Sequence, residues 1–160
     1  MSEINHTKNE ASDILQLVSF KIGKEEFAVD ILKVQEIIKI ISITKVPNSP
    51  HFVEGVINLR GRVIPIIDLR IRLGLEKVQH TNDTRIIVVE LEGNIVGFIV
   101  DAVYEVLRIS KSITEAPPEL VTGVNSEFIT AVGKLEDRIL ILLDLEKVLS
   151  QSEKEVLIDR

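Results

Sequence analysis

The sequence contains no cysteine among its 160 residues, and this absence excludes several kinds of chemistry at once. Disulfide bonds, thiolate nucleophiles and zinc sites with cysteine ligands all need the thiol group. The absence also fits a reducing compartment, where disulfides are rare. The N-terminal stretch lacks the cationic start and apolar core of a signal peptide, so we expect a cytoplasmic protein.

Aromatic residues and long apolar runs are scarce as well. Aromatic residues make up 4% of the chain and tryptophan is absent, although 45% of the residues are hydrophobic. The core must therefore consist mainly of Ile, Val and Leu, and the β-branched residues among them favour strands. The longest apolar runs, such as residues 139–143, are far shorter than the ~20 residues that a membrane-spanning helix needs. This composition favours an all-β fold without a membrane-spanning helix.

The charge balance is acidic, with 19 lysine and arginine residues against 25 aspartate and glutamate residues and a net charge of -6. This balance disfavours a nucleic-acid backbone or an anionic membrane as the main partner. The eight glycines are scattered, so no phosphate-binding loop is present, and the three histidines lack ligand spacing. We therefore expect no cofactor, no metal and no nucleic acid, and another protein is the simplest partner.

The clearest local pattern is a β-hairpin near the middle of the chain. Two aliphatic runs, residues 56–59 and 63–67, flank Arg60 and Gly61, and a glycine in a two-residue turn supplies the positive φ that such turns need. Pro65 lacks an N–H group, which predicts a place at a sheet edge or a barrel opening. Arg60 occupies the turn itself and should face outward, where a partner can reach it.

The chain contains one pattern twice. Phe27, Val29 and Asp30 match Phe98, Val100 and Asp101 at an offset of 71, and residues 62–69 match residues 138–145 at an offset of 76. The repeats cover roughly residues 17–75 and 86–150, and each reads as hairpin, aspartate, short helix, loop, hairpin, aspartate, short helix. Closing so few strands into a barrel removes their edges, and two such barrels side by side bury a shared aliphatic face. The pattern predicts an all-β fold of two paired small β-barrels.

Regions at either end of the repeats are expected to differ from the folded part, residues 15–150. Residues 1–14 are polar and acidic and predict a disordered N-terminal tail. A helix is expected from Leu145 onward, with residues 151–160 as its end or tail. A further helix is expected after Asp30, because Ile31, Val34, Ile37 and Ile38 recur at spacings of three and four before a strand near Ile41.

Strand-end aspartates are the candidates for acid chemistry, namely Asp30, Asp68, Asp101 and Asp144. A pair of such carboxylates would be the basis of an aspartic-type hydrolase. None of them, however, is followed by the small residue and glycine of the Asp-Thr/Ser-Gly loop. Each precedes a helix-like stretch, where an aspartate is expected to cap the helix N-terminus. We therefore expect no enzyme.

Four blocks of the sequence follow one another in a specific order: residues 30–37, 46–50, 55–61 and 65–69, which read DILKVQEI, VPNSP, GVINLRG and PIIDL. Together and in this order, they resemble the CheW family of bacterial chemotaxis coupling proteins. The resemblance extends over roughly residues 15–150. It implies two SH3-like five-stranded β-barrels packed side by side, with short helices and a C-terminal helix, in agreement with the duplication.

The resemblance also implies a non-enzymatic adaptor that joins transmembrane chemoreceptors to the histidine kinase CheA. Such an adaptor binds the cytoplasmic hairpin tip of the receptor and the regulatory domain of the kinase, at the inner face of the membrane. Carried over by position, the receptor or kinase contacts are Val34, Glu36, Gly55, Asn58, Arg60 and Gly97, with Glu36 and Arg60 as a charged pair. The alternatives are core packing for Val34, a turn requirement for Gly55 and an ordinary surface salt bridge for the pair.

Other functions remain open at this stage. The sequence does not distinguish a chemotaxis adaptor from a CheW-like scaffold in another chemosensory-type pathway, such as one that controls surface motility. A hydrolase would need strand-end aspartates with perturbed pKa values. Binding of RNA by small barrels would need an aromatic stacking platform, which the composition does not favour.

Overall fold

The structure, a computed structural model, describes residues 13–117 and 128–149. Its strands are β1 (Ile14–Ile22), β2 (Glu25–Asp30), β3 (Val34–Lys39), β4 (Val53–Leu59), β5 (Arg62–Asp68), β6 (Arg85–Leu91), β7 (Asn94–Val100), β8 (Ala102–Ser110), β9 (Thr114–Glu115), β10 (Ile129–Lys134) and β11 (Ile139–Leu143). Its α-helical turns are α2 (Leu69–Arg72) and α3 (Leu145–Val148), and its 3-10 turns are η1 (Ile31–Lys33) and η2 (Lys111–Ile113). The predicted N-terminal tail up to residue 12 and the predicted C-terminal helix beyond residue 149 lie outside the described residues.

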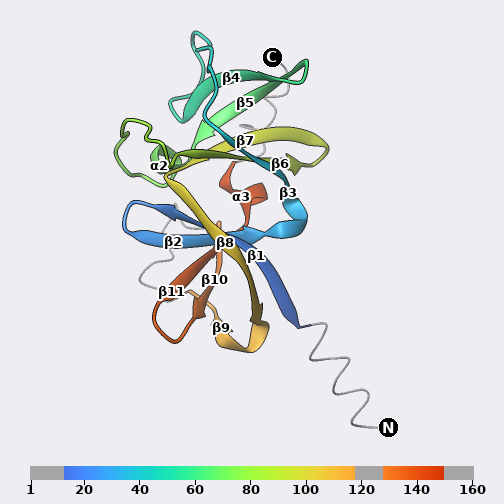
Figure 1. Ribbon diagram of the computed structural model, residues 1–160, viewed down its shortest axis with the longest axis vertical. Coiled ribbons are helices and arrows are strands. Elements are labelled where there is room, and N and C mark those ends of the chain that lie inside the picture. Colours follow the sequence, from blue (N-terminus) through green and yellow to red (C-terminus); the bar gives the residue numbers. More distant parts are fainter. Residues whose placement is uncertain (1–12, 118–127, 150–160) are drawn as a thin grey trace.

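The strands form two sheets that curl into two barrels, one above the other in Figure 1. Barrel A has the strand order β8-β1-β2-β11-β10-β9, and barrel B has the order β3-β6-β7-β5-β4. In barrel B the chain that follows β3 returns to β4 through a bridge between Thr44 and Val56. In barrel A the chain that follows β8 pairs with β10 through β9. The predicted all-β fold of two SH3-like barrels is confirmed.

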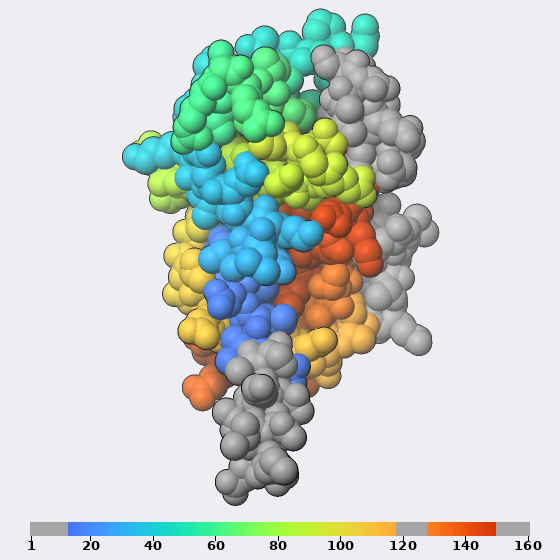
Figure 2. Space-filling model, turned by 90° about the vertical axis from the view of Figure 1, so that its right-hand side faces the viewer, coloured from blue at the N-terminus to red at the C-terminus, as the bar shows by residue number. Residues whose placement is uncertain are grey.

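Each barrel combines strands from both sequence repeats. In barrel A, β1 and β2 come from the first repeat, whereas β8, β10 and β11 come from the second. In barrel B the contributions are reversed, with β6 and β7 from the second repeat and β3, β4 and β5 from the first. Figure 2 shows the same exchange, because blue N-terminal and orange C-terminal residues lie together in its lower half. The expectation that each repeat closes its own barrel is therefore wrong.

The exchange occurs at the connections between the second and third strands of each repeat. Only η1 separates β2 from β3, and only Asp101 separates β7 from β8. In both places the third strand enters the other barrel instead of forming a hairpin with the second strand. Parallel pairing of β11 with β2 and of β5 with β7 joins the repeats.

The largest hydrophobic core lies between the barrels. It joins residues of barrel A with residues of barrel B and with the short helices, including Phe20, Phe27, Ile67, Leu69, Ile87, Phe98, Leu145 and Val148. Smaller clusters fill the interior of barrel B, around Ile66, and of barrel A, around Leu140. Strands β2 and β6 are thus buried on both faces along residues 27–29 and 86–89, which explains the unbroken apolar runs there. The predicted shared aliphatic face is confirmed.

The predicted helix after Asp30 is largely wrong. Asp30 does cap a helical turn, since its Oδ1 accepts from the Leu32 N–H at 2.9 Å, but this turn is only η1. From Val34 the chain is strand β3, paired with β6. A register shift between Val34 and Glu36 breaks the two-residue alternation of the strand. Apolar residues around such a bulge recur at spacings of three and four, which resembles a helix.

Of the other strand-end aspartates, two cap a short helix and one forms a joint, that is, it connects two separate elements. The Asp68 and Asp144 side chains accept from the N–H groups of Arg70 and Glu146, so both cap a short helix as predicted. Asp101 is not a cap, because β8 follows it directly. Its Oδ2 accepts instead from the Gly23 N–H at 2.8 Å and from Arg70 Nη1 at 2.5 Å. Asp101 thereby ties the β1–β2 turn of barrel A to α2.

Pro65 does not lie on an edge strand, because β5 pairs with both β4 and β7. The pairing with β7, however, begins only at Ile66. Pro65 therefore lies where one side of the strand has no partner strand, and its missing N–H breaks no ladder bond there.

Candidate functional site

The β4–β5 turn places Arg60 against Glu36 of β3. Arg60 Nη1 donates to Glu36 Oε2 at 2.5 Å, and Nη2 donates to Oε1 at 2.9 Å, so the contact is bidentate. The Arg60 side chain is 70% exposed and the Glu36 side chain 28%. Because β3 and β4 are the two end strands of the barrel B sheet, the ion pair joins the sides of the seam between them. The structure thus brings together the two charges that the sequence predicts as a pair.

The backbone of this turn holds Arg60 in an unusual conformation. Arg60 has φ +53° and Gly61 has φ +82°, as a two-residue hairpin turn of type I′ requires. Asn58 supports the turn, since its Oδ1 accepts from the Gly61 N–H at 2.9 Å. The predicted Arg-Gly turn is confirmed, and Asn58 belongs to its architecture.

The pair changes the acidity of both groups in the direction that keeps them charged. The hydrogen bond from Arg60, followed by its positive charge, lowers the pKa of the Glu36 carboxyl below its ordinary value. The hydrogen bond to Glu36 and its negative charge raise the pKa of Arg60. At neutral pH the turn therefore presents a charged arginine held by a charged glutamate.

Val34, Gly55 and Gly97 lie in barrel B without reaching outward as Arg60 does. Val34 is half-buried, pairs with Val89 and packs against the core between the barrels. A Cβ on Gly55, which has φ +153°, would come within 2.3 Å of the Thr44 carbonyl oxygen at the bridge that closes the barrel. A Cβ on Gly97 would come within 2.6 Å of the Ile66 side chain in the barrel interior. These three residues shape the barrel that carries the charged turn.

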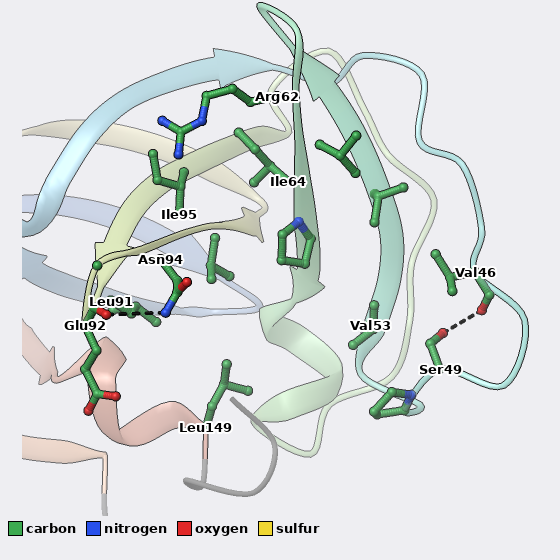
Figure 3. Close-up of a pocket in the computed structure, with 16 residues that line it drawn as sticks. Val46, Ser49, Val53, Arg62, Ile64, Leu91, Glu92, Asn94, Ile95 and Leu149 are labelled. Atoms are coloured by element: carbon green, nitrogen blue, oxygen red, sulfur yellow. Dashed lines mark hydrogen bonds between the residues drawn. The ribbon is translucent and has the colours of Figure 1, made fainter. Parts of the chain in front are cut away.

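Sequence reasoning missed several exposed apolar side chains. Leu32 is 87% exposed on η1, Val63 is 71% exposed on β5, and Val106 is 58% exposed on β8. Val63 also lines an open groove of about 560 Å³ on barrel B. Figure 3 shows this groove between the β4–β5 hairpin, the loop that contains Val46 and Ser49, and Leu149 after α3. The sequence of β5 could have indicated this exposed surface. The strand has apolar residues on both of its faces, although only one face is needed for the barrel interior.

No arrangement for catalysis appears in the described parts of the chain. Residues 13–117 and 128–149 contain no group of three or more histidine, cysteine, aspartate or glutamate side chains placed to hold a metal ion. The four strand-end aspartates serve as three caps and one joint rather than as a dyad. Within the same residues, no helix is long and apolar enough to cross a membrane.

Comparison with known proteins gives a consistent result over most of the chain. The CheW-like domain family matches residues 16–153. The chemotaxis protein CheW of Klebsiella aerogenes is 40% identical over 144 residues, which cover 90% of this chain and 86% of that protein. The chemotaxis protein CheW of Helicobacter pylori is 39% identical over 139 residues, covering 87% and 84% of the two chains.

A solved structure agrees with the sequence relatives. The crystal structure of the scaffolding protein TtCheW from Thermoanaerobacter tengcongensis superposes with a TM-score of 0.80 at 41% sequence identity, over 88% of this chain and 96% of that chain. Proteins of this family are scaffolds and adaptors rather than enzymes. The family match, the relatives and the paired barrels together show that this chain belongs to the CheW family of chemotaxis scaffold proteins.

Proposed function

We propose that this chain couples transmembrane chemoreceptors to the histidine kinase CheA, as an adaptor at the cytoplasmic face of the membrane. Its partners are the cytoplasmic hairpin tip of the receptor and the regulatory domain of the kinase. The observation that carries the proposal is the exposed Glu36–Arg60 pair on the β4–β5 turn, in a chain of a scaffold family.

Arg60 is suited to bind a partner because it is already held in place. A guanidinium carries five N–H donors, and among the described residues Arg60 bonds through two of its nitrogens to Glu36 alone. The remaining donors can bind a carboxylate or carbonyl group of a partner. Since Glu36 and the turn fix the side chain beforehand, the entropic cost of binding through Arg60 is reduced.

The other candidate residues have supporting roles in this proposal. Asn58 holds the turn that carries Arg60, and Glu36 orients the guanidinium. Val34, Gly55 and Gly97 keep barrel B in the shape that places β3 beside the turn. Substitution of Arg60 should therefore change binding without unfolding the chain, whereas substitution of either glycine should change binding through the fold.

Binding measurements on charge-swapped variants test the proposal. We would measure the affinity of a receptor signalling-tip fragment and of the CheA regulatory domain for the wild type, Arg60→Glu, and Glu36→Arg combined with Arg60→Glu. Arg62→Glu is the matched control, because it makes the same charge change two residues away at an exposed position of the same hairpin. Circular dichroism and thermal unfolding verify that each variant is folded.

The expected result is binding of both partners by the wild type and Arg62→Glu, with loss of one partner in Arg60→Glu. Recovery of that partner in the double variant would show that the two charges act as a pair. A folded wild type that binds neither partner would contradict the proposal. The chain would then be a scaffold of another chemosensory-type pathway, and a swarm-plate assay of a deletion strain would examine that role.

A further inference from the structure

Within residues 13–117 and 128–149, the chain passes from one barrel to the other at two places. At η1 it leads from β2 of barrel A to β3 of barrel B, and at Asp101 it leads from β7 of barrel B back to β8 of barrel A. The shared core holds the barrels together between these crossings. Apolar burial is non-directional, so it opposes separation of the barrels more strongly than rotation of one barrel on the other. Directional contacts at the junction therefore bear on the orientation of the barrels.

One directional contact joins α2 to the crossing at Asp101. Arg70 Nη1 donates to Asp101 Oδ2 at 2.5 Å, and Arg70 Nε donates to the Glu76 carbonyl oxygen at 2.9 Å. Asp101 Oδ2 also accepts from the Gly23 N–H, and the Asp101 N–H donates to the Lys21 carbonyl oxygen at 3.0 Å. The Arg70 and Asp101 side chains are only 16% and 22% exposed, which limits screening of the ion pair by water. Asp101 is thus held by the β1–β2 hairpin of barrel A and by α2, which follows β5 of barrel B.

A second directional contact joins α2 to α3. Arg72 Nε donates to the Val148 carbonyl oxygen at 2.6 Å, and the Arg72 guanidinium carbon lies 5.0 Å from the centroid of the Phe52 ring. Val148 is the last residue of α3, which follows β11 of barrel A. The last carbonyl groups of a helix lack partners within the helix, so Arg72 satisfies an acceptor that would otherwise need one. Figure 1 shows α3 between the barrels and α2 at one side of the junction.

The two contacts act together because α2 is itself anchored in the core. Leu69 of α2 is fully buried in the core between the barrels, and Ile71 packs against that core. From this anchor, Arg70 and Arg72 reach two different elements of barrel A, namely the β1–β2 hairpin through Asp101 and the end of α3. Two bodies that touch at three points not on one line cannot rotate relative to each other. The core and the two arginines supply such a set of contacts.

The second repeat lacks both arginines. At the offset of 76 that relates the two hairpins, the counterparts of Arg70 and Arg72 are Glu146 and Val148. Glu146 binds Lys33 of η1 at 2.9 Å, but the two side chains are 34% and 48% exposed, as in an ordinary surface ion pair that contributes little. The contacts of α2 are therefore a specific feature of the first repeat rather than a consequence of the duplication.

We propose that Arg70 and Arg72 of α2 fix the orientation of the two barrels relative to each other. This inference concerns the chain by itself and does not depend on the adaptor function. With its orientation fixed, the chain presents the surfaces of both barrels in one arrangement. A partner that contacts both barrels then binds without the entropic cost of aligning them.

Spin-label distances measure the orientation directly, because the chain has no cysteine of its own to compete for the label. Labels are placed in pairs on cysteines that replace Gln16 of barrel A and Lys39 and Val63 of barrel B, all three exposed. The pairs 16/39 and 16/63 span the junction, and the pair 39/63 lies within barrel B. Each pair is measured by pulsed electron paramagnetic resonance in the otherwise unchanged chain and in Arg70→Gln combined with Arg72→Gln.

Arg138→Gln is the matched control, since Arg138 binds the carboxylates of Glu26, Asp137 and Glu105 within barrel A. It makes the same substitution and lowers stability without touching the junction. The expected result is that both distances across the junction broaden or shift in the double variant, whereas the 39/63 distance keeps its wild-type distribution. In Arg138→Gln all three distributions should stay unchanged. Unchanged distances across the junction in the double variant would overturn the proposal, and so would an equal broadening of the 39/63 distance.

Hydrogen exchange of the single variant Arg70→Gln gives a second measurement, which keeps Arg72 and needs no label. The Asp101 amide, bonded to the Lys21 carbonyl, should exchange faster by on the order of tenfold, because a charge-assisted contact at the crossing is lost. The Thr44 amide, bonded to the Val56 carbonyl within barrel B, should exchange at the wild-type rate. A wild-type exchange rate at Asp101 in this variant would contradict a fixing role for Arg70.

Discussion

Apart from the additional strand β9 in barrel A, the two barrels share one strand order, yet an arginine holds the seam of each barrel in a different way. In barrel B, Glu36 of β3 binds Arg60 in the turn of the β4–β5 hairpin. In barrel A, Glu105 of β8 contacts Arg138, which lies past the turn of the β10–β11 hairpin. Both ion pairs connect the third strand of a repeat to the hairpin that follows it. The arginine, however, occupies a different position of the hairpin.

This difference decides how many donors each arginine can offer to a partner. Arg138 donates from Nε to Glu26 at 2.7 Å and from Nη1 to Asp137 at 3.0 Å, in addition to the 3.5 Å contact with Glu105. Its side chain is 37% exposed, against 70% for Arg60. Arg138 lies past its hairpin turn and is therefore held against the barrel wall by several carboxylates. Arg60 lies in its hairpin turn and therefore protrudes, with Glu36 as its acidic partner among the described residues.

The largest expected difference between the barrels concerns how tightly each one closes, and Gly55 is the residue that tests it. In barrel A the equivalent position is Ala131, which already carries a Cβ, whereas a Cβ on Gly55 would lie 2.3 Å from the Thr44 carbonyl oxygen. We expect Gly55→Ala to lower the free energy of unfolding by at least about 2 kcal/mol, through overpacking and backbone strain. Gly133→Ala is the control, since its nearest contact would be 3.5 Å, and it should change stability by about 1 kcal/mol or less. Urea unfolding measures both, and equal losses would show that the Thr44–Val56 bridge does not limit closure of barrel B.

The next largest expected difference is in how much the equivalent aspartates Asp101 and Asp30 contribute to stability. Asp101 bonds to Gly23 and Arg70 across the junction of the barrels, whereas Asp30 only caps η1 at an exposed position. Asp101→Asn should cost about 1.5 to 3 kcal/mol, because a charge-assisted contact is lost and Arg70 keeps a half-buried charge. Asp30→Asn should cost only a few tenths of a kcal/mol, since asparagine caps about as well as aspartate. Thermal unfolding of the two variants is the measurement, and a larger loss for Asp30→Asn would exclude Asp101 as the joint.

Neutral substitutions of the two seam arginines sharpen the comparison further. Arg138→Gln should lower the unfolding temperature by a few degrees, because it leaves Glu26 without its partner in the barrel wall. Arg60→Gln should leave the unfolding temperature nearly unchanged and should weaken partner binding instead. Differential scanning calorimetry and a binding assay on the same samples separate the two effects. If Arg60→Gln instead lowers the unfolding temperature and Arg138→Gln weakens binding, then Arg60 has a structural role and Arg138 contacts the partner.

The smallest effect concerns the pH dependence of the α2 cap. Burial, as the largest cause, raises the pKa of Asp68, while the N–H groups of Ile71 and Arg70 act in the opposite direction. Because the folded-state pKa lies above the unfolded-state value, the ionised carboxylate disfavours the fold, and this penalty is relieved as the pH falls through the folded-state pKa. Asp68→Asn keeps a capping oxygen and removes the titration.

Acidification should therefore stabilise the wild type slightly relative to Asp68→Asn. Urea unfolding at a series of pH values measures the difference, and Asp144→Asn at the equivalent cap of α3 controls for loss of a capping charge alone. If the difference in unfolding free energy between the wild type and Asp68→Asn does not change with pH, folding is not linked to protonation of the Asp68 carboxyl. Glu36 works in the opposite sense, since its lowered pKa contributes stability that is lost as the pH falls through its folded-state value.

Features that depend on neighbours in sequence were predictable. The Arg-Gly turn and the Asp68 and Asp144 caps are set by a few consecutive residues, whose φ values and side-chain acceptors act locally. The helix expected after Asp30 failed for an equally specific reason. A bulge between Val34 and Glu36 shifts the strand alternation, and the resulting apolar spacing does not distinguish a strand from a helix.

The candidate site was predictable as a list of residues but not as an arrangement. The resemblance indicated Glu36 and Arg60 as a pair, and the structure supplies the bidentate contact across the seam. It also separates Gly55 and Gly97 from the exposed residues, because the close approach of Thr44 and Ile66 to them depends on how the loop before β4 and the strands of barrel B pack together. The groove and the exposed Val63 were missed, since exposure of an aliphatic strand residue depends on what the rest of the chain covers.

The sequence by itself determined the repeat, the all-β class, the turns and most of the caps, because hydrophobic pattern and turn chemistry act over short stretches of chain. The tertiary structure alone decided that the repeats exchange strands, that the largest core lies between the barrels, and that one seam arginine protrudes while the other is held in the wall. These properties depend on pairing and packing between residues distant in sequence. The connections between the second and third strands are as short as those of the hairpins, so only the folded chain shows which sheet the third strand enters.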